Sequence, residues 1–528
     1  MSEHKKRLRR GVFGRLSTDT ARTLRKVPQP VEKVRRSVRE HNLLSESATS
    51  EVLEIDRLRP ESHDHLNPHG AEHEELRQVR DRLAAQSQVT MRLGHMLLES
   101  GASSYRVKLS MARLGRAVGV EQQHSQVTFG EISSTVYAHG TFRTEVSEQR
   151  VFGTNAAKLD RLRHFVQHLK PHVTVEDVNS VLDRIQAFRP EYGTTANMLA
   201  SGIACMCFCF LNRGGFIECL LAGIAATVGQ ALRKQMLVRH MNHFGVWMMC
   251  GLVAATCYIG LATGFQAVLD ATPAIDQAGL PQWFTGTAQG YHAGIISAVL
   301  FLVPGFPLLT GMLDLVRTDI SAGISRLTYV LMLVISAGTA VWLVSLSFNW
   351  VVDPPESAPI DNPWLFLVRM VCSFVAAFGF AMLFNSEVKL CFWAALICAI
   401  VNPIRFFVVE EGMLWQFAVG VEALLIGLAA DAISRISGFR YSRVSLSVPA
   451  SVIMIPGVPL YAALTHMNQG AYTQAISSLV EVLLVVLAIG IGLAIARMLT
   501  DPGWRTEAGL RRAVNLEQVD APAEFFMR

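Results

Sequence analysis

Two carboxyl groups lie inside long apolar runs of the chain. Glu422 stands in the middle of the run 413–432, and Glu481 stands early in the run 476–496. Ionisable side chains within membrane segments are rare, and they commonly mark ion pathways and proton relays. We therefore take Glu422 and Glu481 as candidates for proton coupling. A buried structural hydrogen bond is the alternative for each.

A proline-glycine motif occurs twice, also inside apolar runs. The copies are Pro304, Gly305 and Pro307, and then Pro456, Gly457 and Pro459, at an offset of 152 residues that also relates Ser325 to Ser477. Proline has no backbone donor and clashes with the preceding turn, so both helices should break there. Paired breaks at matching positions of two halves point to a substrate site. Two simple proline kinks are the alternative.

The elements that position these residues follow from composition. Of 528 residues, 51% are hydrophobic and only 17% are charged, whereas soluble domains carry nearer a quarter. Charged residues crowd 1–195, and 196–500 is mostly apolar. Residues 1–40 hold 13 Lys or Arg against 4 Asp or Glu. Such a basic segment either lies near anionic lipid headgroups or is a disordered, solvated tail. No nucleic-acid motif, cofactor motif or metal-ligand spacing accompanies this basic segment.

Ten apolar runs are long enough, or nearly so, to span a membrane. They are 196–212, 215–231, 244–266, 290–312, 326–348, 365–384, 388–404, 413–432, 444–464 and 476–496. With the N-terminus in the cytoplasm, the inner loops hold nine Lys or Arg and the outer loops only Arg213 and Arg405. This bias follows the positive-inside rule. We expect a multi-pass protein of the inner (plasma) membrane with both termini in the cytoplasm.

The offset divides the apolar region into two units of five spans. Because five is odd, the second unit must enter the membrane in the opposite direction, as in transporters with inverted repeats. The expected organisation is a disordered segment 1–73, a cytoplasmic α+β domain 74–190, membrane repeats 196–348 and 365–498, and a cytoplasmic tail 499–528. In the α+β domain we expect helices over 83–100, 107–118, 159–169 and 175–188, and strands over 127–137 and 142–152 joined at His139-Gly140.

Three motifs, in the same order, resemble the threonine/serine exporter family. They are the stretch 94–103 followed by Arg106-Val107, the stretch 304–326 with Asp314, Asp319, Ser325 and Arg326, and the stretch 456–461. The resemblance covers roughly 88–498. It implies a ten-span exporter that uses the proton motive force to move small hydroxy amino acids outward. The family often has an acid after Arg-Val, where this chain has Lys108.

Transport of a zwitterion needs two kinds of partner. Backbone N–H groups of the helices that begin at the two breaks suit the carboxylate, and a membrane acid suits the ammonium. Asp314, Arg317, Asp319 and Arg326 are expected at the cytoplasmic mouth, either as an ion-pair gate or as helix caps that follow the charge bias. The expected partners are threonine or serine, protons and membrane lipids; nucleic acid is not among them, and a homo-oligomer stays open.

Three alternative functions remain at this stage. The protein could export a small dicarboxylate such as succinate, or form a channel without proton coupling. The 74–190 domain could be an enzyme that uses Ser103, Ser104, His124 or Glu131. Because no nucleophile elbow, zinc-protease motif or phosphate-binding loop accompanies these residues, we do not expect catalysis.

Overall fold

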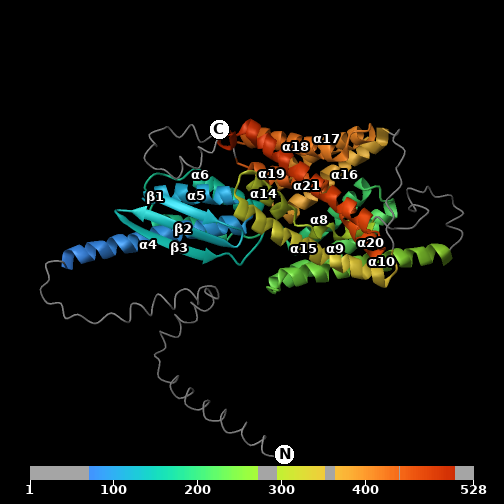
Figure 1. Cartoon of the computed structure of the whole chain (residues 1–528), viewed down its shortest axis with the longest axis horizontal. Coiled ribbons are helices and arrows are strands. Elements are labelled where there is room, and N and C mark those ends of the chain that lie inside the picture. The colour runs from blue at the N-terminus through green and yellow to red at the C-terminus, as the bar shows by residue number, and fades with distance from the viewer. Residues whose placement is uncertain (1–69, 272–293, 351–362, 439, 506–528) are drawn as a thin grey trace, which may run out of the picture. The chain divides into compact units, whose positions relative to one another are not determined.

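The computed structural model describes residues 70–271, 294–350, 363–438 and 440–505. Residues 1–69 of the predicted disordered segment 1–73 and most of the predicted tail 499–528 lie outside these residues, and the last four residues of that segment, 70–73, belong to a helix. The N-terminal part consists of α4 Gly70–Glu99, α5 Ser104–Ala117, β1 Gln122–Val127, β2 Glu131–Ala138, β3 Thr141–Glu148, α6 Ala156–Gln167 and α7 Val175–Gln186. Figure 1 shows the strands beside α4 and α5.

The sheet is antiparallel in the order β1-β2-β3. Ile132, Ser134, Val136 and Ala138 of β2 are buried in alternation with more exposed neighbours, as a sheet with one covered face requires. The turn at His139-Gly140 is confirmed, because both residues have positive φ. The expectation of two strands was wrong. Strand β1 was missed because its sequence, QQHSQV, is almost entirely polar.

The membrane part follows the predicted order of helices. Its elements are α8 Thr194–Leu211, α9 Phe216–Val238, α10 His243–Ala271, α13 Gly294–Val299, η2 Leu300–Leu302, α14 Gly305–Val316, α15 Ile320–Ser347, α16 Pro363–Leu383, α17 Val388–Glu410, α18 Trp415–Ile436, α19 Arg443–Ser451, η3 Val452–Met454, α20 Gly457–Asn468, α21 Tyr472–Thr500 and the short α22 Pro502–Arg505. In the described part of the chain, eight helices are long and apolar enough to cross a membrane, or nine with α13–α14 as one broken span.

Both expected helix breaks are present. The first lies between η2 and α14, where the two segments are bent by 68°. The second lies between η3 and α20, at the same place in the motif. In each copy the residue before the proline, Val303 or Ile455, has extended backbone, and proline imposes this conformation on its predecessor.

Several helices of the two membrane units begin at matching offsets. Helices α9 and α17 begin at 216 and 388, and α10 and α18 begin at 243 and 415, an offset of 172 in both cases. Helices α14 and α20 begin at 305 and 457, an offset of 152. The segment from the start of the third element to the break is therefore 20 residues shorter in the second unit, since 172 − 152 = 20. Because of this change, residues of the second and third elements cannot be matched between the two units at the offset of 152 that the sequence motif gives.

Helices α8 and α16 are the equivalent first elements of the two units, and they pack antiparallel. Asn197, near the start of α8, donates to the carbonyl of Met382, near the end of α16, at 3.4 Å. Further along, Cys207 lies beside Cys372. Gly379 allows close approach in between, because a Cβ there would lie 2.7 Å from the carbonyl oxygen of Ala200.

One predicted boundary needs a correction that affects the site. The span expected over 388–404 continues through Pro403 to Glu410. Arg405 is therefore a buried residue of α17 and not a residue of an outer loop. Its guanidinium has partners inside the protein, which a count of loop charges could not reveal.

Candidate functional site

The two breaks lie against each other. A Cβ at Gly305 would lie 2.8 Å from Cγ2 of Val452, and a Cβ at Gly457 would lie 3.9 Å from Cδ1 of Leu300 and 3.4 Å from Cγ2 of Ile296. Leu300 and Val452 are equivalent at the offset of 152. Each break thus packs against the helix end that precedes the other break. Glycine at both positions lets the two backbones come close.

Side chains of neighbouring helices satisfy the carbonyl groups that the first break exposes. Arg233 of α9 donates from Nη1 to the carbonyl of Phe301 at 3.0 Å, and Trp247 of α10 donates from Nε1 to the carbonyl of Leu302 at 2.5 Å. The guanidinium also lies over the indole ring, 4.3 Å from its centroid. Irregular backbone at membrane depth needs such partners, because lipid offers none.

Arg405 is the equivalent of Arg233 in the second unit, but it binds elsewhere. The two residues occupy the same position of α9 and α17, since 405 − 233 = 172. Nε of Arg405 lies 2.6 Å from Oε2 of Glu422 on α18. Nε and Nη2 also donate to Oδ1 of Asn402, at 3.2 and 2.7 Å. Glu422 in turn is the equivalent of Cys250, since 422 − 250 = 172, so the second unit has an acid where the first has a thiol.

The two candidate acids have different surroundings. Glu422 is 2% exposed and pairs with Arg405, so it is not an isolated carboxyl group. The contact is an ion pair without good hydrogen-bond alignment, and Oε1 has no partner among the described residues. Glu481 is partly exposed on α21, and none of the described residues forms an ion pair with it. Their roles in proton coupling remain predictions.

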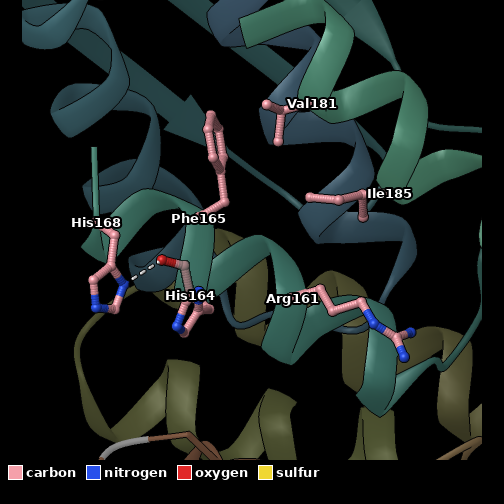
Figure 2. A pocket seen from close by; sticks show the side chains of 6 residues that line it. All are labelled: Arg161, His164, Phe165, His168, Val181 and Ile185. Carbon is pink, nitrogen blue, oxygen red and sulfur yellow. Dashed lines mark hydrogen bonds between the residues drawn. The ribbon is translucent and has the colours of Figure 1, made fainter. Parts of the chain in front are cut away.

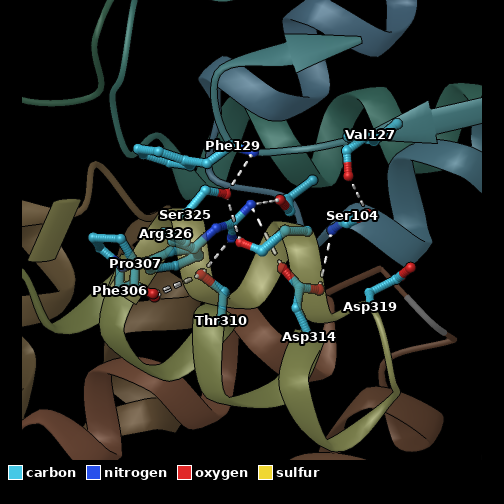
Figure 3. Close-up of polar contacts among 12 residues, drawn as sticks. Ser104, Val127, Phe129, Phe306, Pro307, Thr310, Asp314, Asp319, Ser325 and Arg326 are labelled. Carbon is cyan, nitrogen blue, oxygen red and sulfur yellow. Dashed lines mark hydrogen bonds and ion pairs between the residues drawn. The ribbon is translucent and has the colours of Figure 1, made fainter. Parts of the chain in front are cut away.

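Arg326 and Asp314, expected at a cytoplasmic mouth, form a buried contact with the N-terminal domain. Arg326 is 1% exposed; it donates to Oγ1 of Thr310 at 2.6 Å and to the carbonyl of Ala102 at 2.9 Å. Its Nη2 lies 3.8 Å from Oδ2 of Asp314, whose Oδ1 accepts from the backbone N–H of Ser104 at 3.1 Å. Figure 3 shows these contacts converging between α14, α15 and the start of α5.

Other motif residues extend the same junction. Lys108 of α5 lies 2.5 Å from Oδ1 of Asp319, and the backbone N–H of Phe129 donates to Oγ of Ser325 at 3.2 Å. The ring of Phe306, next to the first break, fills the space beside Gly101, where a Cβ would lie 2.8 Å from it. The first membrane motif therefore joins the broken helix to the N-terminal motif. Whether Asp314, Asp319, Ser325 and Arg326 also gate transport remains a prediction.

Sequence reasoning missed Arg233, Trp247 and the partners in the N-terminal domain. Arg233 was counted as an inner-loop charge, yet it lies in α9 and its guanidinium points at the break. The sequence did contain an indication, because Arg233 follows the apolar run 215–231 by less than one helical turn and the helix could continue through it. The backbone groups of Ala102 and Ser104 carry no sequence signal of their own.

A groove on the N-terminal domain lies apart from this site. It has a volume of about 380 Å³ and lies between α6 and α7. Its lining, drawn in Figure 2, consists of Arg161, His164, Phe165, His168, Val181 and Ile185. Nδ1 of His168 donates to the carbonyl of His164 at 2.9 Å, so this histidine is used within the helix. Among the described residues no group of three or more metal-ligating side chains is present.

Comparison with known families gives two adjacent matches. Residues 88–348 match a family described as a putative threonine/serine exporter. Residues 369–499 match a family described as a threonine/serine exporter, ThrE. The first match spans the N-terminal domain and the first membrane unit, and the second covers most of the second unit. No solved structure matches the chain.

Similar proteins fall into two groups. A protein of Escherichia coli named as a probable succinate transporter subunit, YjjP, is 28% identical over 243 residues, which are 46% of this chain and 86% of that protein. An uncharacterised protein of Schizosaccharomyces pombe is 22% identical over 80% of this chain and 56% of its own length. A pheromone-regulated membrane protein of Kluyveromyces lactis is 22% identical over 80% of this chain and 44% of its own length.

Proposed function

Because the chain belongs to the threonine/serine exporter family, which makes it a membrane transporter, we propose that it exports threonine and serine with the proton motive force as the energy source. The observation that carries this proposal is the reciprocal packing of the two breaks, with Gly305 against Val452 and Gly457 against Leu300. In transporters, substrate sites commonly lie where discontinuous helices of two repeats meet.

The proposed substrate site uses the N-termini of α14 and α20. Both helices begin at a break, so the positive ends of their dipoles suit a carboxylate. The N–H groups of Gly305 and Gly457 already donate to the carbonyls of Val303 and Ile455 at 2.8 Å, and Pro307 and Pro459 have none, so the N–H between the glycine and the second proline is the one proposed to bind it. Ser451, at the end of α19, is fully buried, and its hydroxyl has no hydrogen-bond partner among the described residues. A polar substrate at the breaks would supply one.

The proposed coupling device is the pair of Arg405 and Glu422. A neutral Glu422 would no longer hold the guanidinium of Arg405. In the first unit, the equivalent Arg233 binds a carbonyl of the broken helix. In the second unit, the carbonyl equivalent to that of Phe301 belongs to Ile453, since 301 + 152 = 453. This carbonyl is the proposed acceptor for the guanidinium of Arg405 after its release. Proton uptake would in this way be linked to the second break.

We also propose that the chain spans the inner (plasma) membrane and that both of its termini lie in the cytoplasm. The antiparallel packing of α8 and α16 supports units of opposite direction, which a five-span repeat requires. The N-terminal domain then contacts the cytoplasmic end of α14 through Ser104 and Asp314.

A second substrate is favoured by the relative named as a succinate transporter subunit. The test is efflux of labelled threonine, serine and succinate from proteoliposomes that contain the purified full-length protein. We expect threonine and serine to leave when a proton gradient is imposed and to leave slowly when it is collapsed. Efflux of succinate alone would reassign the substrate. Equal efflux with and without the gradient would show a channel.

A further inference from the structure

Four arginines gather where the N-terminal domain meets the ends of α19 and α21. Arg106 lies on α5 and Arg163 on α6, while Arg443 begins α19 and Arg497 lies in the last turn of α21. The charge of Arg106 acts on both Arg163 and Arg497, and the charge of Arg443 acts on all three of the others. A buried group of like charges is unfavourable unless something compensates it.

Direct contacts connect Arg443 and Arg497 with the residue that precedes Arg106. Nη1 of Arg443 donates to Oγ1 of Thr500 at 2.9 Å, three residues beyond Arg497. Arg497 lies over the ring of Trp504, with 5.1 Å between its Cζ and the ring centroid. Arg317 lies over the same ring at 5.0 Å and over the ring of Tyr105 at 3.4 Å. Tyr105 is the residue before Arg106 in α5. The contacts through Arg497, Trp504 and Arg317 therefore connect Arg443 of α19 with α5.

Each neighbouring carboxylate already accepts a hydrogen bond or forms an ion pair, although Oδ2 of Asp160 has no hydrogen-bond partner among the described residues. Asp431 contacts both Arg443 and Arg435. Oδ1 of Asp160 accepts from the N–H of Ser442 at 3.1 Å and from the hydroxyl of Ser445 at 3.0 Å.

The third acid, Asp501, accepts from the N–H of Gly503 at 3.0 Å. With Arg317 and Arg435 included, six guanidinium groups therefore face three acids. Burial raises the pKa of one of these acids, Asp160, to about 6.

Two of the arginines have unused donors. Arg497 is 7% exposed, and its Nη2 has no hydrogen-bond partner among the described residues. Arg106 is partly buried, and it forms no hydrogen bond or ion pair with any described residue. An unpartnered buried guanidinium is costly, so a ligand that accepts from both would be strongly favoured.

We propose that Arg106, Arg163, Arg443 and Arg497 form a binding site for a small oxyanion, a carboxylate or a phosphate group. The planar fork of arginine matches both groups through two parallel hydrogen bonds. The site is distinct from the helix breaks, and it does not depend on the proposed substrate. The oxyanion would bridge the N-terminal domain and the second membrane unit. Its source is a free dicarboxylate, inorganic phosphate or an anionic lipid headgroup.

The test is the thermal unfolding midpoint of the purified full-length protein in detergent. Sodium succinate, sodium phosphate and added phosphatidylglycerol are each compared with sodium chloride of equal ionic strength, or with phosphatidylcholine for the lipid. We expect at least one of the three to raise the midpoint, and the effective one identifies the source. If none raises it, the proposal is wrong.

Variants locate the effect. Arg497→Gln and Arg106→Gln should each weaken the apparent affinity at least tenfold, whereas Arg184→Gln, at an exposed residue of α7, should leave it unchanged. Should Arg497→Gln fail to fold, Arg106→Gln still decides, because this side chain is only partly buried. An affinity that is equal in all variants would place the oxyanion elsewhere and overturn the assignment.

Discussion

Arg233 and Arg405 occupy the same position of the second helix in the two membrane units, yet their guanidinium groups bind different partners. Arg233 donates to the carbonyl of Phe301 at the first break, and Arg405 lies against Glu422. The second unit has Glu422 where the first has Cys250, and Asn402, which also binds Arg405, where the first has Gln230. Because only the second unit has an acid at this position, the two units differ at the place where we propose that a proton binds.

This relationship predicts how variants of the pair will behave. Arg405→Gln should destabilise the protein by roughly 3 kcal/mol, because it leaves Glu422 as an unpaired buried acid. Glu422→Gln should destabilise it similarly and should also make export insensitive to the proton gradient. The double variant Glu422→Gln/Arg405→Gln should recover stability but not proton dependence. The measurements are unfolding midpoints and efflux with and without an imposed gradient.

The double variant separates a structural role from a coupling role. If it recovers both stability and gradient-driven export, Glu422 is a structural partner of Arg405 only. In that case Glu481→Gln is the next variant to test, since Glu481 lies on α21 without an ion pair among the described residues.

A charge exchange tests the junction between the N-terminal domain and the first membrane motif. Lys108→Glu places two acids at the contact with Asp319, and we expect a loss of about 2 kcal/mol, as for a charged hydrogen bond. The double variant Lys108→Glu/Asp319→Lys, which exchanges the two charges, should restore most of the lost stability. Unfolding midpoints of the single and double variants measure the coupling. A double variant no more stable than the two singles would show that the contact adds nothing to docking.

Asp160 predicts a pH dependence of stability. Burial raises the pKa of its carboxyl from 3.8 to about 6, against the opposing effects of Arg163 and of hydrogen bonds from Ser445 and Ser442. Because the folded state holds this proton more tightly, the stabilisation is complete below pH 4 and is lost as the pH rises through 6. The size is roughly 3 kcal/mol, from about two pKa units.

The variant Asp160→Asn keeps the accepting oxygen and cannot ionise. We expect its unfolding free energy to change little between pH 4 and 8, and to exceed that of the wild type at pH 8. Thermal unfolding at pH 5 and pH 8 checks this. A variant less stable than the wild type at pH 8 would mean that the nearby arginines hold the carboxylate in its charged form.

The sequence predicted the order of the membrane helices and both breaks, because apolar length and proline chemistry act locally. It did not reveal the offset of 172, since the second unit is 20 residues shorter between the start of the third element and the break. It also missed what Asp314 and Arg326 contact. Their partners include backbone groups of Ala102 and Ser104, which lie over 200 residues away and have no residue type to recognise.

The proposed opposite orientation of the two membrane units predicts which loops face outward. Single cysteines at Asp276 and Asp353, both outside the described residues, should react with an impermeant thiol reagent applied to intact cells. A cysteine at Arg184 on α7 should react only after permeabilisation. All nine native cysteines must first be replaced. Labelling of Arg184→Cys in intact cells would reverse the proposed orientation, and labelling of only one of the two loop positions would contradict the inverted arrangement.

Finally, the two glycines of the breaks should differ in their tolerance of a side chain. A Cβ at Gly305 would lie 2.8 Å from Cγ2 of Val452, which is too close, whereas a Cβ at Gly457 would lie 3.4 Å from Cγ2 of Ile296, close to ordinary contact. We therefore expect Gly305→Ala to weaken substrate binding or to destabilise the fold, and Gly457→Ala to be nearly neutral. Valine at either position should crowd the same junction and weaken binding.

A compensating variant distinguishes packing from substrate contact. Val452→Ala removes the methyl group that a Cβ at Gly305 would approach most closely, and it leaves Cδ1 of Ile455, the flexible end of its side chain, at 3.2 Å. Gly305→Ala/Val452→Ala should therefore regain most of the unfolding midpoint of the Val452→Ala single variant. If substrate binding to the purified protein returns with it, Gly305 is needed only for close packing of the two breaks. If stability returns and binding does not, the added methyl group occupies space that the substrate requires, and the site lies at the break itself.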